Sequence, residues 1–149
     1  VVPRLALRAG AAQPDFPSLG ISAAALRIVA DAMDQVVNHY LGTARKSRIE
    51  DPAMAIGGKT GTSQVRRITM AERAADLHNN KKKRWRDRDH ALFVGFAPVT
   101  APQYAVAVVV EHGGGGSKTA APIASAVLAE AQRRDSARAA ETIAAVSSS

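Results

Sequence analysis

The sequence predicts an α/β (α+β) domain whose central antiparallel sheet carries helices on both faces. Residues 90–97 and 104–111 are apolar at nearly every position, which is typical of strands covered on both sides. The connector 98–103 is too short for a helical crossover, so these two strands are expected to run antiparallel. Apolar residues recur at helical spacing over 23–39, which indicates an amphipathic helix.

The first third of the chain is expected to hold an edge strand, a loop and that helix. Residues 1–8 alternate arginine and leucine, and Pro3 restricts such a strand to a sheet edge. Proline and glycine over 10–20 indicate a loop, and Ser22 is placed to cap the helix 23–39. A second loop over 42–52 follows.

The rest of the chain is expected to supply three strands and a second helix. Residues 54–67 form a strand entered through two glycines, and the charged segment 79–89 is expected to be exposed. After the two apolar strands, the glycines at 113–116 form a turn, and Pro122 suits the first turn of a helix over 121–133. We expect one domain portion over 1–134 and a disordered alanine- and serine-rich tail over 135–149.

Composition excludes several classes of site. The 149 residues contain no cysteine, so disulfides and thiolate chemistry are excluded, and the four histidines lack partners at metal-ligand spacing. The formal charge of +7 invites a nucleic-acid partner, yet the segment 65–89 alone holds nine Lys/Arg against four Asp/Glu. We interpret this segment as a solvated loop and expect no metal, cofactor or nucleic acid.

The candidate site is the strand start Lys59, Thr60, Gly61 and Thr62. Thr60 and Thr62 lie two residues apart, so both hydroxyls project from one strand face. Gly61 lets a ligand approach the backbone, and Lys59 supplies a positive charge. Such an edge can bind a carboxylate, pair with an extended peptide, or hold a developing oxyanion through its N–H groups. Taken alone, the tetrapeptide favours an ordinary exposed strand start, because short motifs recur by chance.

Longer blocks around the motif carry a resemblance. Residues 58–65 (Gly-Lys-Thr-Gly-Thr-Ser-Gln-Val), 90–98 (His-Ala-Leu-Phe-Val-Gly-Phe-Ala-Pro) and 108–116 (Val-Val-Val-Glu-His-Gly-Gly-Gly-Gly) lie in this order. Together with 17–21 and 42–44 they resemble the C-terminal end of class B penicillin-binding proteins of the penicillin-binding protein 2 type, the elongation-specific peptidoglycan D,D-transpeptidases. The resemblance covers roughly residues 1–133 and implies a fold like that of serine β-lactamases, here incomplete.

The resemblance also implies a mechanism and residue roles. In the family a serine attacks the penultimate D-Ala of a stem peptide, and an amine from a neighbouring peptide then resolves the acyl-enzyme. Lys59 would assist proton transfer, Thr60 and Thr62 would bind the carboxylate of a stem peptide or β-lactam, and the N–H of Thr62 would hold the oxyanion. Gly61 would keep the strand open. The full protein would be anchored in the inner membrane by an upstream helix, face the periplasm, and join elongation-complex membrane proteins.

Two family motifs do not occur in this chain. No serine is followed by lysine at the Ser-x-x-Lys spacing, and no Ser-x-Asn fits. The nucleophile is therefore expected upstream of Val1, and the isolated chain is expected to be inactive. Two alternatives stay open at this point: a serine β-lactamase fragment, disfavoured because about 25 residues separate the motif from the next strand, and a non-enzymatic basic binding module, which would show salt-sensitive binding.

Overall fold

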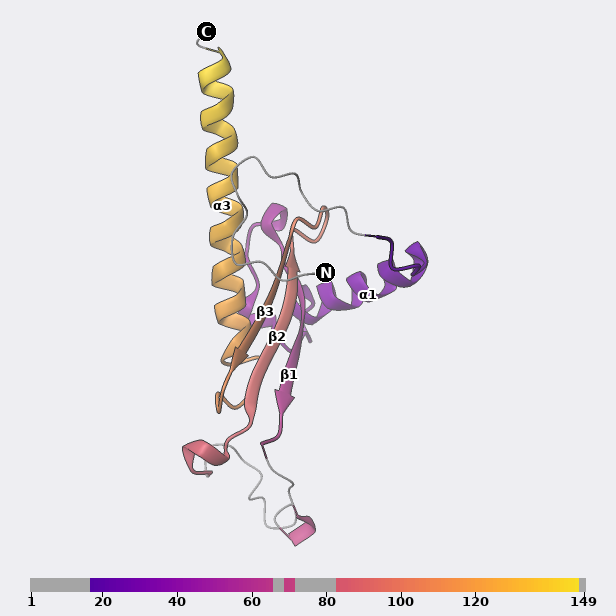
Figure 1. Cartoon of the computed structure of the whole chain (residues 1–149), viewed down its shortest axis with the longest axis vertical. Coiled ribbons are helices and arrows are strands. Elements are labelled where there is room, and N and C mark those ends of the chain that lie inside the picture. Colours follow the sequence, from indigo (N-terminus) through magenta and orange to yellow (C-terminus); the bar gives the residue numbers. More distant parts are fainter. Residues whose placement is uncertain (1–16, 66–68, 72–82, 148–149) are drawn as a thin grey trace.

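The structure, a computed structural model, describes residues 17–65, 69–71 and 83–147. Its centre is an antiparallel sheet in the order β1-β2-β3, made of β1 (Gly57–Ser63), β2 (His90–Ala97) and β3 (Tyr104–Val110). The helices α1 (Ala23–Asn38) and α3 (Ala120–Ser147) pack against this sheet (Figure 1). Short 3₁₀ turns lie at Arg45–Ser47, Pro52–Met54 and Trp85–Asp87. The predicted fold class and the antiparallel pairing are confirmed.

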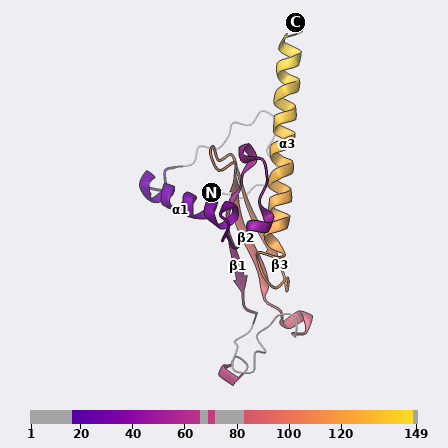
Figure 2. The same ribbon diagram turned by 180° about the vertical axis from the view of Figure 1, so that it is seen from behind.

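The two helices contact opposite faces of the sheet (Figure 2). Cross-strand partners share a face, and α3 covers the face on which Phe93 of β2 lies opposite Val108 of β3. The other face carries Phe96, which pairs with Gly57. A methyl group added to Gly57 would lie 3.4 Å from the backbone nitrogen of Asp34, so α1 contacts the sheet there.

Apart from Phe93, the buried core is aliphatic and built largely from small residues. Phe93, Ile56, Leu128 and Val37 are its largest fully buried side chains. The remaining core positions are alanines of the Ala44 turn, of β2 and of α3, at 44, 91, 97, 120, 121 and 124. Because alanine adds little bulk, α3 can pack close to the strands, and a low aromatic content is sufficient to fill this space.

Helix α1 begins where its sequence predicts but is covered only near its end. The hydroxyl of Ser22 accepts a hydrogen bond from the N–H of Ala25 at 3.2 Å, which confirms the predicted cap. Val37 is buried, whereas Leu26 and Val29 are 52% and 56% exposed. The N-terminal half of α1 extends away from the sheet (Figure 1), so its apolar stripe has no partner among the described residues.

The sheet is covered less completely than its apolar strands predict. On β3, Tyr104, Val106, Val108 and Val110 pack toward α3, but the alternating positions are exposed, with Val109 at 62%. Val94 of β2, on the same open face, is 48% exposed. The contacts of α1 concentrate on β1, which leaves this part of the second face without cover among the described residues.

Helix α3 is longer than its sequence predicts. The helix was expected over 121–133 with a disordered tail over 135–149, but it continues to Ser147, so the tail prediction is wrong for 135–147. Alanine-rich sequence has high intrinsic helix propensity, and Glu130 forms ion pairs with Arg133 and Arg134 one turn later at 2.6 and 2.8 Å. The hydroxyl of Tyr104 also donates a hydrogen bond to Asp135.

The charged segment 79–89 contains two buried residues, against the expectation that it is exposed. The Nζ atom of Lys83 lies 3.1 Å from a carboxylate oxygen of Asp89, and the two side chains are only 4% and 10% exposed. Each charge neutralises the other, which makes burial of both possible. The edge strand predicted over 1–8 and part of the charged segment lie outside the described residues.

Candidate active-site edge

The four candidate residues lie consecutively on β1 and surround one edge of the sheet. Thr60 and Thr62 pair with Phe93 and Ala91, so both project from the α3 face, as predicted. Lys59 pairs with Val94 and projects from the opposite face. Thr62 and Lys59 are exposed and Thr60 is half-buried. An ammonium group and two hydroxyls therefore flank the same edge from its two sides.

Strand β1 leaves this edge open. Among the described strands β1 pairs only with β2. A methyl group added to Gly116 would lie 2.3 Å from the carbonyl oxygen of Leu92 and 2.4 Å from that of Gly61, so the oxygens of this pair both lie between β1 and β2. Backbone groups alternate in direction along an antiparallel strand, and those of Thr60 and Thr62 accordingly point to the open edge. The N–H of Thr62 is free to meet a ligand lying along this edge.

Lys59 carries a charge that no described acidic side chain neutralises. Its Nζ atom donates a hydrogen bond to the carbonyl oxygen of Thr60 at 2.7 Å, and it forms no ion pair within the described part of the chain. The lysine is thus held along the strand near the hydroxyls. An ammonium, two hydroxyls and an open N–H together form a surface suited to a carboxylate or an oxyanion.

Thr43 belongs to this edge, although its role was not recognised in the sequence. Its hydroxyl is hydrogen-bonded to that of Thr60 at 3.2 Å. Thr43 follows a tight turn at Gly42, where an added methyl group would lie 2.4 Å from the carbonyl oxygen of Val36. The N–H of Ala44 donates to the same oxygen at 2.9 Å, which fixes the turn on the end of α1. The signal in the sequence that could have identified Thr43 is its hydroxyl, which directly follows the turn glycine Gly42.

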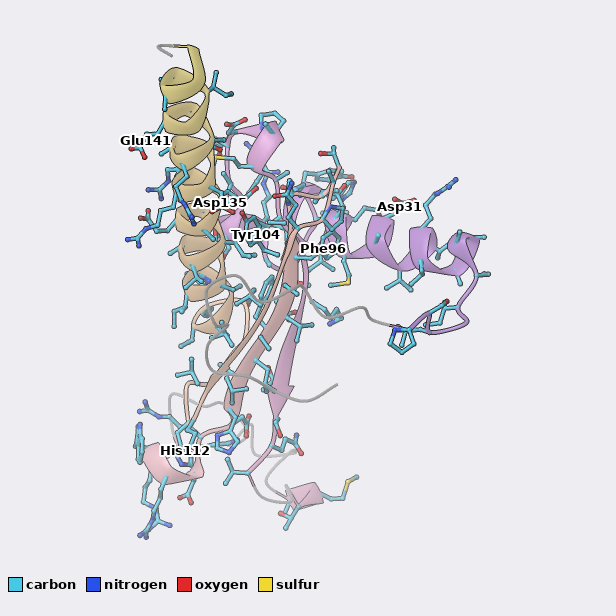
Figure 3. All side chains as sticks on the ribbon, turned by 45° about the horizontal axis from the view of Figure 1, so that its top comes forward. Asp31, Phe96, Tyr104, His112, Asp135 and Glu141 are labelled. Carbon is cyan, nitrogen blue, oxygen red and sulfur yellow. The ribbon has the colours of Figure 1, made fainter. Side chains whose placement is uncertain are left out.

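The aromatic rings of Trp85, His90 and His112 form a cluster at the end of the sheet, next to the charged segment. His90 pairs with Ser63 at the end of β1, and its Nδ1 accepts a hydrogen bond from the N–H of His112 at 2.9 Å. His112 has a positive φ of 55°, and its ring packs against Trp85 with centroids 4.5 Å apart. Figure 3 shows His112 at the end of the sheet far from Tyr104 and Asp135. These contacts give His112 a structural role at the end of the sheet.

Two hollows in the surface lie away from the candidate edge. The larger, of about 710 Å³, is lined by α3 and the start of β3, including Tyr104, Gln132 and Asp135. The hydrogen bond to Asp135 raises the pKa of Tyr104. The smaller, of about 310 Å³, lies between α1 and the turn before β1. Lys59, Thr60, Gly61 and Thr62 line neither hollow, which is consistent with an edge that binds its ligand by strand addition.

The described residues lack two further features, a metal-binding cluster and a membrane-spanning helix. They contain no group of three His, Cys, Asp or Glu side chains placed to hold a metal ion. None of the described helices combines the length and apolar character needed to cross a membrane.

Similar proteins of known sequence share this region. Peptidoglycan D,D-transpeptidase MrdA of Acinetobacter baumannii is 41% identical over 96 residues, which cover 62% of this chain and 13% of the relative. MrdA of Escherichia coli K12 is 38% identical over 105 residues, covering 70% of this chain and 16% of the relative. The chain therefore spans only a small part of the length of the curated relatives it matches.

Solved structures give the same result. Pseudomonas aeruginosa PBP2 in complex with WCK 5153 matches with a TM-score of 0.55 and 40% identity, over 76% of this chain and 21% of the solved one. PBP2 of Helicobacter pylori, in a complex with MreC, matches with a TM-score of 0.54 and 32% identity, over 70% and 17%. The family model described as "Penicillin binding protein transpeptidase domain" matches residues 11–129. The chain belongs to the penicillin-binding protein transpeptidase domain family.

Proposed function

We propose that this chain is the C-terminal part of a peptidoglycan D,D-transpeptidase that cross-links stem peptides in cell-wall elongation and is acylated by penicillin. The observation that carries the proposal is the open edge of β1, where Lys59 and the hydroxyls of Thr60 and Thr62 flank an unpaired backbone. The similarity to MrdA proteins and PBP2 structures supports it. The activity belongs to the complete protein, because this chain holds one wall of the site.

In the proposed reaction the edge binds the substrate and stabilises charge. The stem peptide lies along β1, and its terminal carboxylate accepts hydrogen bonds from the hydroxyls of Thr60 and Thr62. A serine supplied by another part of the protein attacks the penultimate carbonyl carbon, and the N–H of Thr62 donates to the developing oxyanion. The carbonyl–nitrogen bond breaks and D-Ala leaves after its nitrogen gains a proton. Lys59 assists this transfer by holding positive charge beside the site.

The second half of the reaction uses the same edge. An amine of a neighbouring stem peptide attacks the ester carbonyl, loses a proton, and forms the cross-linking amide while the serine regains its proton. The oxyanion again forms next to the N–H of Thr62. Gly61, between the two threonines, has no side chain, which lets the acyl chain remain against β1 throughout.

The proposal is tested by covalent labelling with a fluorescent penicillin. We expect the complete protein to be labelled, and Lys59→Met to lower the second-order acylation constant by about 100-fold or more, because charge stabilisation in such sites is worth about 2.7–4 kcal/mol. Lys46→Met is the matched control, since Lys46 is also an exposed lysine of this chain and lies in a turn outside β1. An unlabelled complete protein, or equal constants for both variants, would contradict the proposal.

The isolated chain provides a second test. Residues 1–149 contain no Ser-x-x-Lys, so we expect no covalent labelling of the chain by itself. Adding unlabelled benzylpenicillin in excess distinguishes specific from non-specific signal. Specific labelling of the isolated chain would place a nucleophile within it and would overturn the assignment of the serine to another part of the protein.

The similarity to D,D-transpeptidases favours this function over both alternatives. The curated relatives reported above are transpeptidases, and the charged segment that separates β1 from β2 is longer than the short turn expected in a serine β-lactamase. Lys83, one cation of the charged segment, is buried in an ion pair and is therefore withdrawn from the exposed surface that a basic binding module would use.

The proposal extends to location and partners. We infer that the complete protein is held in the inner membrane, faces the periplasm, and assembles with membrane proteins of the elongation complex. The solved H. pylori PBP2 complex with MreC supports such a partner. Cell fractionation and co-purification of the tagged complete protein test this inference, and recovery from the cytoplasm without membrane proteins would refute it.

A further inference from the structure

The glycine run at 113–116 contacts strand β1 at the candidate edge, on the α3 side of the sheet. It connects β3 to α3, and Gly116 is buried. A methyl group added to Gly116 would lie 2.4 Å from the carbonyl oxygen of Gly61, 3.0 Å from its nitrogen, and 2.3 Å from the carbonyl oxygen of Leu92. Gly61 is the residue between Thr60 and Thr62. Gly116 therefore rests directly on the backbone segment that sets the position of both threonines.

The glycine run is itself fixed at several points. The N–H of Gly114 donates to the carbonyl oxygen of Asp89 at 2.8 Å, and the hydroxyl of Thr119 donates to the carbonyl oxygen of Gly113 at 2.8 Å. The carbonyl oxygen of Gly116 accepts from the N–H groups of Ala120 and Ala121 at 3.1 and 2.9 Å, which ties it to the start of α3. The loop is thus anchored to both neighbouring elements.

The anchor at Asp89 is held in turn by the buried Lys83. Their ion pair joins residues on the two sides of the Trp85–Asp87 turn, directly before β2. The backbone oxygen of Asp89 then holds Gly114, as described above. A chain of contacts therefore runs from this ion pair through the glycine run to the backbone of Gly61.

We propose that Gly116 is a positioning residue, which supports Gly61 from the α3 side and thereby sets the edge formed by Lys59, Thr60 and Thr62. This inference rests on the transpeptidase function proposed above. The atoms that a methyl group at Gly116 would meet are all backbone atoms, and these cannot rotate away as a side chain can. A side chain at position 116 must therefore displace β1 or the loop. Gly116 touches no substrate and acts through the position of the Thr62 N–H.

The neighbouring glycine provides a matched control. A methyl group added to Gly115 would meet no heavy atom within 4 Å, and Gly115 has no positive φ, in contrast to Gly114 at 83°. Gly115→Ala and Gly116→Ala make the same chemical change at adjacent positions of one loop. A difference between them reports on the contact with Gly61 and not on the loss of a glycine.

The test measures acylation of the complete protein by a β-lactam in stopped flow, which separates the binding constant from the acylation rate constant. We expect Gly116→Ala to lower the acylation rate constant by about 100-fold, because a displacement of about 1 Å in a catalytic group has this effect. We expect Gly115→Ala to stay within about twofold of the wild type. A merely structural role would reduce the amount of folded protein and leave the rate constants of the folded fraction unchanged.

A second variant covers the case in which Gly116→Ala does not fold. Thr119→Val keeps the size of the side chain and removes the hydroxyl that holds Gly113, so the loop loosens without a clash. We expect acylation to slow by about fivefold, the worth of one hydrogen bond. If Gly116→Ala folds and acylates at the same rate as Gly115→Ala, the inference fails. If Gly116→Ala does not fold, the inference fails when Thr119→Val acylates at the same rate as Gly115→Ala. An unlabelled wild type would instead refute the proposed function.

Discussion

The α3 face of the sheet and the open edge of β1 differ in how their residues are used. On the α3 face, Phe93 and Leu128 are at most 2% exposed and are surrounded by alanines that permit close packing. Along the edge, Lys59 and Thr62 are exposed, and no other described strand pairs with this side of β1. The two regions meet at Gly61, which Gly116 contacts from the α3 side. The difference indicates that the buried core lies on one side of the strand, while the proposed chemistry uses its exposed edge.

The comparison is tested most strongly by removing Phe93. We expect Phe93→Ala to lower the free energy of unfolding by about 3–5 kcal/mol, since it leaves a cavity in the core. Urea unfolding of the complete protein measures this loss. Val94→Ala is the control on the adjacent residue, which faces the other side and is 48% exposed, and should cost about 1 kcal/mol or less. Equal losses for the two variants would contradict the assignment of the core to the α3 face.

Breaking the buried ion pair should have the next largest effect on stability. Lys83→Met removes the ammonium group that lies 3.1 Å from the buried carboxylate of Asp89, and we expect a loss of about 3 kcal/mol in the free energy of unfolding. The double variant Lys83→Met/Asp89→Leu removes both charges and should recover much of this loss. Thermal unfolding compares the stability of the wild type, Lys83→Met and the double variant. A double variant less stable than Lys83→Met would argue against the loss of the Lys83–Asp89 ion pair as the cause.

A change on the edge should affect chemistry without affecting stability. Thr62→Val keeps the shape of the side chain and removes its hydroxyl, so we expect penicillin acylation of the complete protein to fall by about tenfold, the worth of a hydrogen bond to a charged group. The melting temperature should stay near that of the wild type, because Thr62 is exposed. The control is Thr100→Val, an exposed threonine of the connector between β2 and β3. Equal acylation by both variants would remove Thr62 from the site.

The smallest expected effect lies on α3, beyond the sheet. The hydrogen bond from Arg134 and the charge of Arg133 hold the pKa of Glu130 below its usual value. A carboxylate with a lowered folded pKa contributes stability above its unfolded pKa and loses it as pH falls through the folded pKa. We therefore expect the protection factors for amide exchange in the exposed part of α3 to fall slightly in acid. Glu130→Gln should abolish this pH dependence, and an unchanged profile would contradict the ion pairs.

Local patterns were sufficient to predict most of the elements. The spacing of apolar residues predicted the bounds of α1 and of the strands at 90–97 and 104–110 to within one residue. The short connector between the two strands required them to pair antiparallel. The alternation of a strand placed Thr60 and Thr62 on one face. By contrast, the serine-rich end of the chain suggested disorder where α3 continues to Ser147. Alanine propensity and the pairs of Glu130 outweigh that signal.

Contacts between distant segments were outside the reach of these patterns. The pairing of Thr43 with Thr60 joins residues on different elements, and the burial of Lys83 depends on Asp89 returning beside it. The charged segment was interpreted from composition alone, which does not distinguish a cation in solvent from one paired in the interior.

The sequence by itself determined the fold class, the Lys-Thr-Gly-Thr edge and the family resemblance, because each depends on residue types at short, fixed spacing. Only the tertiary structure decided how that edge is supported. Gly116 lies far from Gly61 in the sequence, and nothing in a run of four glycines shows which one must lack a side chain. The decision comes from packing, since one glycine rests on the backbone of β1 while its neighbour has open space.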